Sequence, residues 1–228
     1  KPCQRAKLIM VGTREQYLEA MGISVWVPRD AESVRTSGLD GINGNWEDLQ
    51  DVVRVCTKCQ LHEGRTQTVF GVGRNDADLL IVGEAPGAEE DRRGEPFVGR
   101  AGQLLNAMLG AIQLTREDVY IANILKCRPP NNRDPKPEEA ATCTPYLERQ
   151  IELLQPKIML ALGRIAAQWL LQSNSSIGSL RGREFTFGEQ AVPLIVSYHP
   201  AYLLRSPLAK AKAWEDLVLV RRILQVHK

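Results

Sequence analysis

The sequence predicts an α/β fold in which helices cover both faces of a parallel sheet. Apolar runs without a helical period, such as Leu79-Leu-Ile-Val82, are typical of strands buried on both faces. Longer segments with apolar residues at helical spacing alternate with these runs along the chain. Because alternating strands and helices are joined by right-handed crossovers, the strands are expected to lie parallel in one sheet.

Four strands and five helices make up the predicted core. Strands are expected at about 78–83, 119–125, 158–162 and 193–197, and helices at about 46–55, 101–112, 138–154, 164–171 and 210–226. In the last helix, the residues expected to face inward are Trp214, Leu217, Val218, Val220 and Ile223. The turn-rich segment 172–191 is expected to include a small hairpin around Phe185 and Phe187.

The composition is that of an ordinary globular protein, with 43% apolar and 25% charged residues. Because no run of about 18 apolar residues is present, no membrane span is expected. No cleavable leader is visible, which favours a cytoplasmic protein. The net charge of only +2 does not by itself indicate a nucleic-acid-binding protein, so local basic patches would have to provide such binding.

Polar residues follow three of the four predicted strands. Glu84 lies after the first strand in Gly83-Glu-Ala-Pro-Gly87, Asn123 lies near the end of the second strand, and His199 follows the fourth. The carboxyl ends of parallel strands meet at one sheet edge, where open α/β folds bind ligands. The sequence therefore predicts a site at this edge, although each residue taken alone could be a polar turn residue.

Four of the five cysteines form a possible ligand set. Cys56 and Cys59 are a Cys-x-x-Cys pair, and Cys127 and Cys143 flank a proline-rich loop at 128–137. Four thiolates can close a tetrahedral zinc site or hold an iron–sulfur cluster, and the spacing does not separate the two. Four unrelated buried cysteines are the remaining alternative, and Cys3 is expected to be free.

The N-terminal part predicts a short helix and a linker outside the main domain. The domains expected are a partner-binding segment at 1–30, a linker at 31–45 rich in Ser, Gly, Asn and charge, and a main domain at 46–228. A helix of about 10 residues cannot hold itself together in water, so it must dock on its own domain or on a partner.

Four motifs carry a resemblance to a known family. They are Gly83-Glu-Ala-Pro-Gly87, Gly94-Glu-Pro-Phe-Val-Gly-Arg-Ala-Gly-Gln-Leu-Leu105, Ala122-Asn-Ile-Leu-Lys-Cys-Arg-Pro-Pro130 and His199-Pro-Ala-Tyr-Leu-Leu204. With the four cysteines, they resemble the family 4 uracil-DNA glycosylases over about residues 46–226. The resemblance implies a three-layer α/β/α sandwich around a four-stranded parallel sheet, and it favours a [4Fe-4S] cluster over zinc.

The resemblance also implies how the base is recognised. A monofunctional glycosylase hydrolyses the N-glycosidic bond of deoxyuridine that is flipped out of single- or double-stranded DNA. Phe97 is expected to stack on uracil, the Asn123 amide to read O4 and N3–H, and the backbone at Ala85 to donate to the base. Glu90 resembles a residue that crowds uracil C5 and excludes thymine.

The same resemblance assigns the bond-breaking step. His199 resembles a donor to uracil O2 that stabilises the developing anion. Glu84 resembles a carboxylate that positions water and stabilises the sugar cation. Some relatives trap the sugar covalently through a histidine in a basic insert beside the second motif, and this sequence has no such insert. Ordinary hydrolysis without a covalent product is therefore expected.

DNA contacts are expected near the last motif. Leu203, Leu204 and Arg205 are expected to enter the minor groove as an apolar wedge with a basic neighbour. Candidates for phosphate contacts are Lys126, Arg128, Arg133, Arg164 and Arg205.

The N-terminal segment carries a second resemblance, at about residues 13–29. It resembles the chi-binding segment of the psi subunit of the bacterial DNA polymerase III clamp loader, with contacts expected from Tyr17, Leu18, Met21, Ile23 and Trp26. A chi-like partner would tether the glycosylase to the replisome. The alternative function is a psi-like clamp-loader subunit in which the glycosylase-fold domain is structural or only binds DNA.

Overall fold

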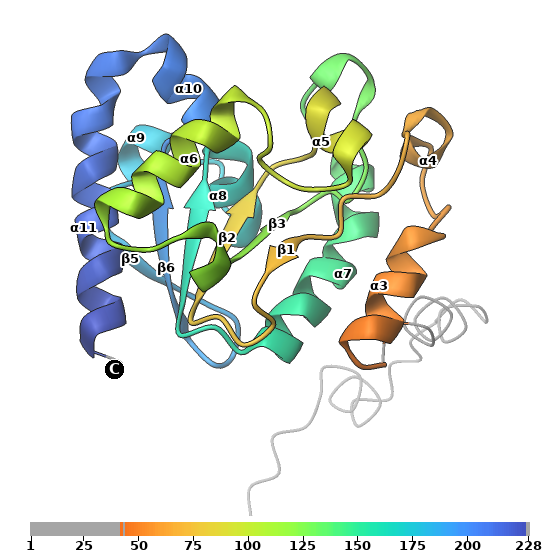
Figure 1. Cartoon of the computed structure of the whole chain (residues 1–228), viewed down its shortest axis with the longest axis horizontal. Coiled ribbons are helices and arrows are strands. Elements are labelled where there is room, and N and C mark those ends of the chain that lie inside the picture. Colours follow the sequence, from red (N-terminus) through yellow and green to blue (C-terminus); the bar gives the residue numbers. More distant parts are fainter. Residues whose placement is uncertain (1–41, 43, 227–228) are drawn as a thin grey trace, which may run out of the picture. The chain divides into compact units, whose positions relative to one another are not determined.

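The computed structural model describes Ile42 and residues 44–226, which fold as a sheet between two layers of helices (Figure 1). The predicted N-terminal segment and linker, with the expected partner contacts Tyr17, Leu18, Met21, Ile23 and Trp26, lie outside the described residues. In the described part of the chain, no helix is both long and apolar enough to cross a membrane.

The sheet has six strands in the order β1-β3-β2-β4-β6-β5. The four central strands are parallel: β3 (Tyr120–Asn123), β2 (Leu79–Gly83), β4 (Ile158–Leu162) and β6 (Val192–Ser197). Two short antiparallel strands, β1 (Val72–Gly73) and β5 (Glu184–Phe187), form the edges. The predicted parallel strands are thus confirmed, but a sheet of only four strands was wrong.

The two edge strands give a weaker sequence signal than the central strands, for a physical reason. Strand β1 is only two residues long and includes a glycine, so it leaves almost no periodic signal. Strand β5 pairs with β6 as the predicted hairpin around Phe185 and Phe187, and its residues are exposed or half-buried in alternation. Edge strands of this kind lack the continuous apolar run that marks the central ones.

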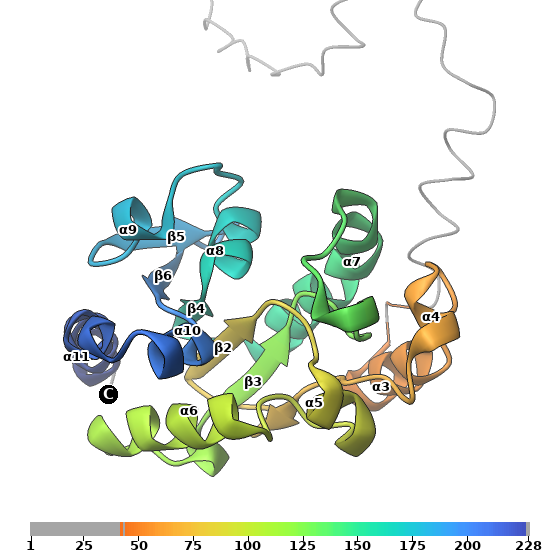
Figure 2. The same cartoon turned by 90° about the horizontal axis from the view of Figure 1, so that it is seen from above.

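Each central strand sends alternate side chains into two separate cores. Leu80 and Val82 of β2 pack with α3 (Trp46–Arg54), α7 (Pro137–Leu154) and α8 (Arg164–Leu170). Leu79 and Ile81 pack on the other face with α6 (Arg100–Ala111), α10 (Pro200–Arg205) and α11 (Lys210–Val226). Figure 2 shows α7 and α8 on one side of the strands and α6 on the other. The three-layer prediction is confirmed for this part of the chain.

Short elements fill the connections. They are α4 (Leu61–Gly64), α5 (Ala88–Arg93), η1 (Arg116–Asp118), η2 (Pro130–Asn132), α9 (Ile177–Leu180) and η3 (Pro207–Ala209). Helix α7 begins with a proline at its first turn followed by Glu138 and Glu139, which suit the positive end of the helix dipole.

The inward face of α11 differs from the prediction. Leu217 and Val220 are buried with Ala213, but Trp214 is 46% exposed and Val218 is 37% exposed. Positions 213, 217 and 220 follow i, i+4 and i+7 spacing, so they form the stripe that faces the sheet. Trp214 and Val218 lie one residue further around the helix and face outward.

Candidate active site and cysteine cluster

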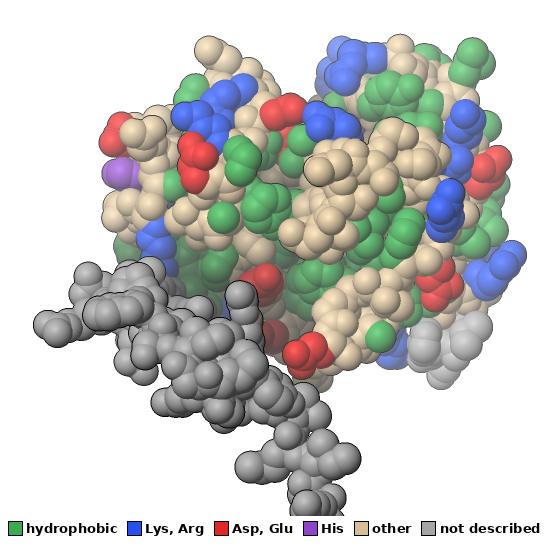
Figure 3. All heavy atoms as spheres, turned by 180° about the vertical axis from the view of Figure 1, so that it is seen from behind, with side chains coloured by type: hydrophobic (Ala, Val, Ile, Leu, Met, Phe, Trp, Pro, Cys, Tyr) green, Lys and Arg blue, Asp and Glu red, His purple; other side chains and the backbone are tan. Residues whose placement is uncertain are grey.

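The predicted polar residues lie at one edge of the sheet, as their positions after parallel strands require. Glu84 directly follows β2, Asn123 is the last residue of β3, and Gly83 is paired in register with Asn123. His199 caps helix α10 just after the end of β6. Figure 3 shows the surface notched at its upper margin, the end toward which β2 and β6 point in Figure 1.

Asn123 and Phe97 meet at Gly83. Asn123 is 2% exposed, and Phe97 comes from the loop between α5 and α6. A Cβ on Gly83 would overlap Asn123 Oδ1 and would lie 2.7 Å from Phe97 Cζ. The close approach of the amide, the ring and the strand therefore requires glycine at this position.

The Phe97 ring also stacks on His199. The two ring centroids are 5.5 Å apart with an interplanar angle of 30°. Phe97 has a φ of 54°, in the left-handed region that costs a non-glycine residue roughly 1–3 kcal/mol. Glu90 faces the same loop, where its Oε1 accepts hydrogen bonds from Val98 N (2.9 Å) and Gly99 N (3.1 Å). Its expected role at uracil C5 stays a prediction.

His199 is set up as a neutral donor. Its Nδ1 accepts a hydrogen bond from Ala201 N at 3.1 Å, which leaves the proton of the neutral ring on Nε2. Burial, together with the charge of Arg205, lowers the pKa of His199 to about 4, against a smaller opposing effect of Glu90. The ring is therefore uncharged at neutral pH, and Nε2–H is available to a ligand.

The pKa of Glu84 is shifted in the opposite direction from that of His199. Burial raises the pKa of Glu84 to about 7, with a further contribution from the charge of Asp134 and an opposing one from Arg164. Arg164 is engaged with Asp134 through a 2.7 Å ion pair, so it offsets only part of the effect of burial. A carboxyl that titrates near neutrality can hold or release a proton during a reaction.

The sequence analysis missed a buried ion pair that supports the segment before His199. Asp216 of α11 is fully buried and pairs with Arg181 at 2.8 Å. The Arg181 guanidinium lies 5.8 Å from the centroid of the Tyr198 ring. A charged residue inside the apolar stripe of α11, between Ala213 and Leu217, is the signal that could have identified Asp216.

Cys56, Cys59, Cys127 and Cys143 line one cavity, as the sequence predicts. Three of the sulfurs accept hydrogen bonds: Cys127 from Arg65 Nη1 (3.1 Å), Cys56 from the Tyr146 hydroxyl (3.1 Å) and Cys143 from Lys126 N (3.2 Å). Such donors stabilise thiolate ligands and tune iron–sulfur clusters. The residues around this cavity therefore fit a cysteine-ligated cluster.

Burial also affects the protonation of two of these thiols. Burial raises the pKa of Cys143 to about 12 and also raises the pKa of Cys127. A thiolate at either position is therefore costly unless a bound cation stabilises it. Among residues 42 and 44–226, no three His, Cys, Asp or Glu side chains converge as ligands of one metal ion, so the support for a cluster is the cavity that the four cysteines share and the donors to three of their sulfurs.

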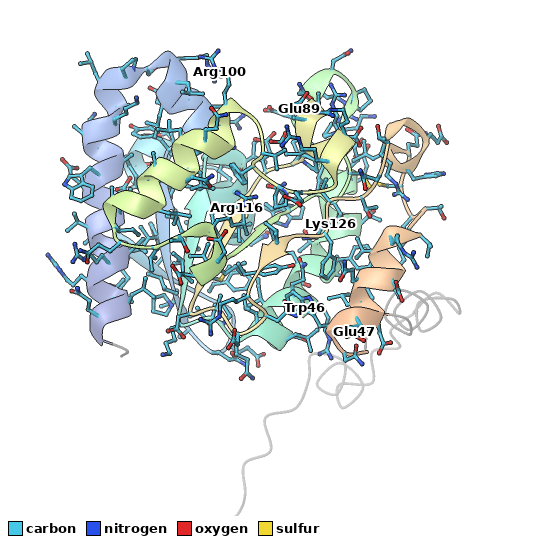
Figure 4. The ribbon with its side chains drawn as sticks, viewed as in Figure 1. Trp46, Glu47, Glu89, Arg100, Arg116 and Lys126 are labelled. Atoms are coloured by element: carbon cyan, nitrogen blue, oxygen red, sulfur yellow. The ribbon has the colours of Figure 1, made fainter. Side chains whose placement is uncertain are left out.

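Two of the residues predicted to contact DNA are buried in this structure. Leu203 is 1% exposed and packs in the core with α6 and α11, so it cannot enter a groove. Lys126, labelled in Figure 4, is 1% exposed, and its Nζ donates to Asn123 O (2.9 Å) and Gln150 Oε1 (2.5 Å). It therefore cannot reach a phosphate.

The other predicted DNA contacts lie near the surface. Leu204 is 37% exposed on α10, followed by exposed Arg205 and by Leu208, which is 94% exposed. Arg128 and Arg164 are hydrogen-bonded on the surface, and Arg133 pairs with Glu139. On the face that Figure 3 shows, which is the back of the molecule, the visible Lys and Arg side chains are scattered, in keeping with the small net charge.

Comparison with known proteins assigns this chain to a family. The sequence profile of the Uracil DNA glycosylase superfamily matches residues 70–218. The type-4 uracil-DNA glycosylase of Archaeoglobus fulgidus is 48% identical over 75% of this chain and 90% of its own length. Those of Thermotoga maritima and Saccharolobus solfataricus are 45% and 42% identical, covering 70% and 79% of this chain and 83% and 87% of their own lengths.

These similarities lend no support to the clamp-loader alternative, and the chi-binding role of the N-terminal segment stays a prediction. The residues that the family profile matches, 70–218, include Glu84, Phe97, Asn123 and His199. The chain belongs to the uracil-DNA glycosylase superfamily and, within it, to the type-4 uracil-DNA glycosylases.

Proposed function

We propose that the chain excises uracil from DNA by hydrolysis, in a pocket formed by Glu84, Phe97, Asn123 and His199. The single observation that carries this proposal is the meeting of the Asn123 amide and the Phe97 ring at Gly83, with His199 stacked on Phe97. An aromatic surface beside a buried amide and a neutral donor suits a flat, polar base.

Base selection follows from the chemistry of these groups. A uracil flipped out of the helix stacks on Phe97, which contributes about 1–3 kcal/mol. The Asn123 amide donates to uracil O4 and accepts from N3–H, and the backbone N–H at Ala85 donates to the base. Cytosine presents the opposite pattern, so a mismatched buried amide costs about 1–3 kcal/mol.

Bond cleavage places charge on both fragments. As the bond between N1 and C1′ breaks, its electron pair leaves with uracil, and His199 Nε2–H donates to the negative O2. The Glu84 carboxylate faces the sugar cation and takes a proton from the water whose oxygen bonds to C1′. Glu84 then releases this proton to solvent and the uracil anion takes one up, so the products are free uracil and an abasic sugar, with no covalent enzyme intermediate.

We further propose that Cys56, Cys59, Cys127 and Cys143 hold a [4Fe-4S] cluster, with zinc as the alternative. The cavity that the four sulfurs line and the donors to three of them support this assignment. When bound, the cluster supplies a structural crosslink between the segment 56–59, the loop 128–137 and α7.

The cluster proposal is tested by metal and sulfide analysis of the purified protein. Cys143→Ser should lose iron and sulfide and melt at a lower temperature, while Thr144→Ser, its neighbour in α7, should keep both. Zinc with no sulfide in the wild-type protein would select the alternative.

The activity is tested with a uracil-containing oligonucleotide, alkaline cleavage of the abasic product and electrophoresis. Wild-type protein should produce strand breaks, while Asn123→Ala and His199→Ala should lose most of the activity. Asn106→Ala, an exposed asparagine on α6, is the matched control and should behave as wild type. Full activity in either pocket variant would contradict the assigned roles.

A further inference from the structure

Two oppositely charged side chains hold the backbone of the loop that carries Phe97. Arg116 donates from Nη1 to Phe97 O at 3.2 Å and from Nη2 to Pro96 O. On the same loop, Glu90 Oε1 accepts from Val98 N and Gly99 N. Four consecutive residues, 96–99, thus have a main-chain group bonded to one of these two side chains.

This loop needs such support because Phe97 has a left-handed backbone conformation. A bulky residue keeps a positive φ only where its surroundings over-determine the conformation. Helix α6 contributes to this as well, because a Cβ on Gly102 would overlap the Phe97 carbonyl. The carbonyl that Arg116 holds on one side is therefore also enclosed by the first turn of α6.

Arg116 connects the loop to the strand that carries Asn123. It begins the short η1 helix, which leads directly into β3, and β3 ends at Asn123. The loop that carries Phe97 joins α5 to α6. The contacts with carbonyl oxygens thus tie the chain that leads into β3 to the loop that carries Phe97.

Arg116 is partly buried, so its charge carries a desolvation cost that a fully exposed arginine would not have. Burial lowers the pKa of Arg116, while the charges of Glu95, Glu117 and Glu90 raise it. Its guanidinium donates to two neutral carbonyls, and a half-buried charge is retained where such hydrogen bonds compensate for lost water.

We propose that Arg116 and Glu90 are positioning residues that preset the Phe97 ring for stacking on uracil. Arg116 acts through the loop backbone, without touching the base, and this inference rests on the proposed stacking role of Phe97. Presetting the ring means that the incoming base does not have to order the loop, which improves binding of both uracil and the transition state.

The test is a double-mutant cycle on uracil excision under single-turnover and steady-state conditions. Arg116→Ala should lower kcat/KM about tenfold and weaken inhibition by free uracil by a similar factor, because a displaced stacking surface affects every bound base. In a Phe97→Ala background, Arg116→Ala should cost less than about twofold, because the ring that it positions is gone. Arg74→Ala, which removes an exposed arginine paired with Asp76, is the matched control and should change neither value.

Arg116→Lys keeps the charge but replaces a forked donor with a single ammonium, so it should recover only part of the lost affinity for uracil. It also serves the same cycle where Arg116→Ala fails to fold, as judged by thermal melting. An equal loss from Arg116→Ala with and without the Phe97 ring would overturn the inference, as would unchanged inhibition by uracil. Full activity of Phe97→Ala alone would instead overturn the stacking role of Phe97, and with it the positioning role of Arg116 and Glu90.

Discussion

Gly83 and Asn123 face each other at the ends of neighbouring parallel strands, and the Asn123 amide occupies the space where a side chain on Gly83 would begin. The same position is 2.7 Å from the Phe97 ring. The geometry of the base pocket therefore depends on the absence of one methyl group.

Gly83→Ala should reduce kcat/KM about 100-fold, since a misplacement of about 1 Å of a positioned group costs this much. The atoms nearest to the new Cβ belong to the Asn123 amide and the Phe97 ring, so these are the parts that must move. The measurement is uracil excision together with inhibition by free uracil. Gly110→Ala is the control: no heavy atom lies within 4 Å of its new Cβ, and alanine should stabilise helix α6 by about 0.5–1 kcal/mol. An active Gly83→Ala protein would show that Asn123 does not read the base.

The pH profile should separate Glu84 from His199. Since burial raises the pKa of Glu84 to about 7, kcat/KM should rise with pH through about 7 as the carboxylate forms. His199, with its pKa lowered to about 4, should add no limb near pH 6.5. Glu84→Gln should remove the limb along with most of the activity. A limb that survives in Glu84→Gln would assign it to another group.

The same shifts predict how stability depends on pH. The folded pKa of Glu84 is above its unfolded value, so between about pH 4.5 and 7 the folded state binds more protons and stability falls as pH rises. The folded pKa of His199 is below its unfolded value, so stability falls as pH drops from about 6.5 to 4. Glu84→Gln should therefore raise the melting temperature at pH 8 but not at pH 4, as measured by circular dichroism.

Sequence analysis predicted the central sheet and the site because both depend on local patterns. Four apolar runs specify the parallel strands, and the residue after each run must lie at the same edge. The burial of Leu203 and Lys126 could not be predicted this way. Leu203 follows an exposed tyrosine in a six-residue helix, and one of the two acceptors of the buried Lys126 ammonium, Gln150, is distant in sequence.

Lys126→Met tests whether Lys126 is a buried structural residue and not a phosphate contact. The substitution keeps much of the volume but leaves Asn123 O and Gln150 Oε1 without their donor, at a cost of about 1–3 kcal/mol each. We expect a lower melting temperature and weaker discrimination between uracil and cytosine, with no change in the salt dependence of DNA binding. Arg205→Ala should do the reverse, reducing the slope of log K against log salt by about one without changing stability. A reduced slope for Lys126→Met would restore it as a phosphate contact.

Arg181 forms ion pairs with two acidic residues, one buried and one exposed, so the contributions of the two pairs to stability can be compared. Arg181 bonds both fully buried Asp216 and Glu215, whose side chain is 66% exposed. Asp216→Ala leaves the guanidinium without its buried partner and should destabilise the fold by about 3–5 kcal/mol. Glu215→Ala removes only the solvent-exposed partner and should cost about 0–1 kcal/mol.

Urea denaturation measures both variants. Because Arg181 also lies over the Tyr198 ring, just before His199, folded Asp216→Ala protein should lose excision activity as well, while Glu215→Ala should keep it. Equal stability losses from the two variants would mean that burial does not decide the strength of this pair. A stable but inactive Asp216→Ala protein would instead mean that the pair serves the position of His199 more than the stability of the fold.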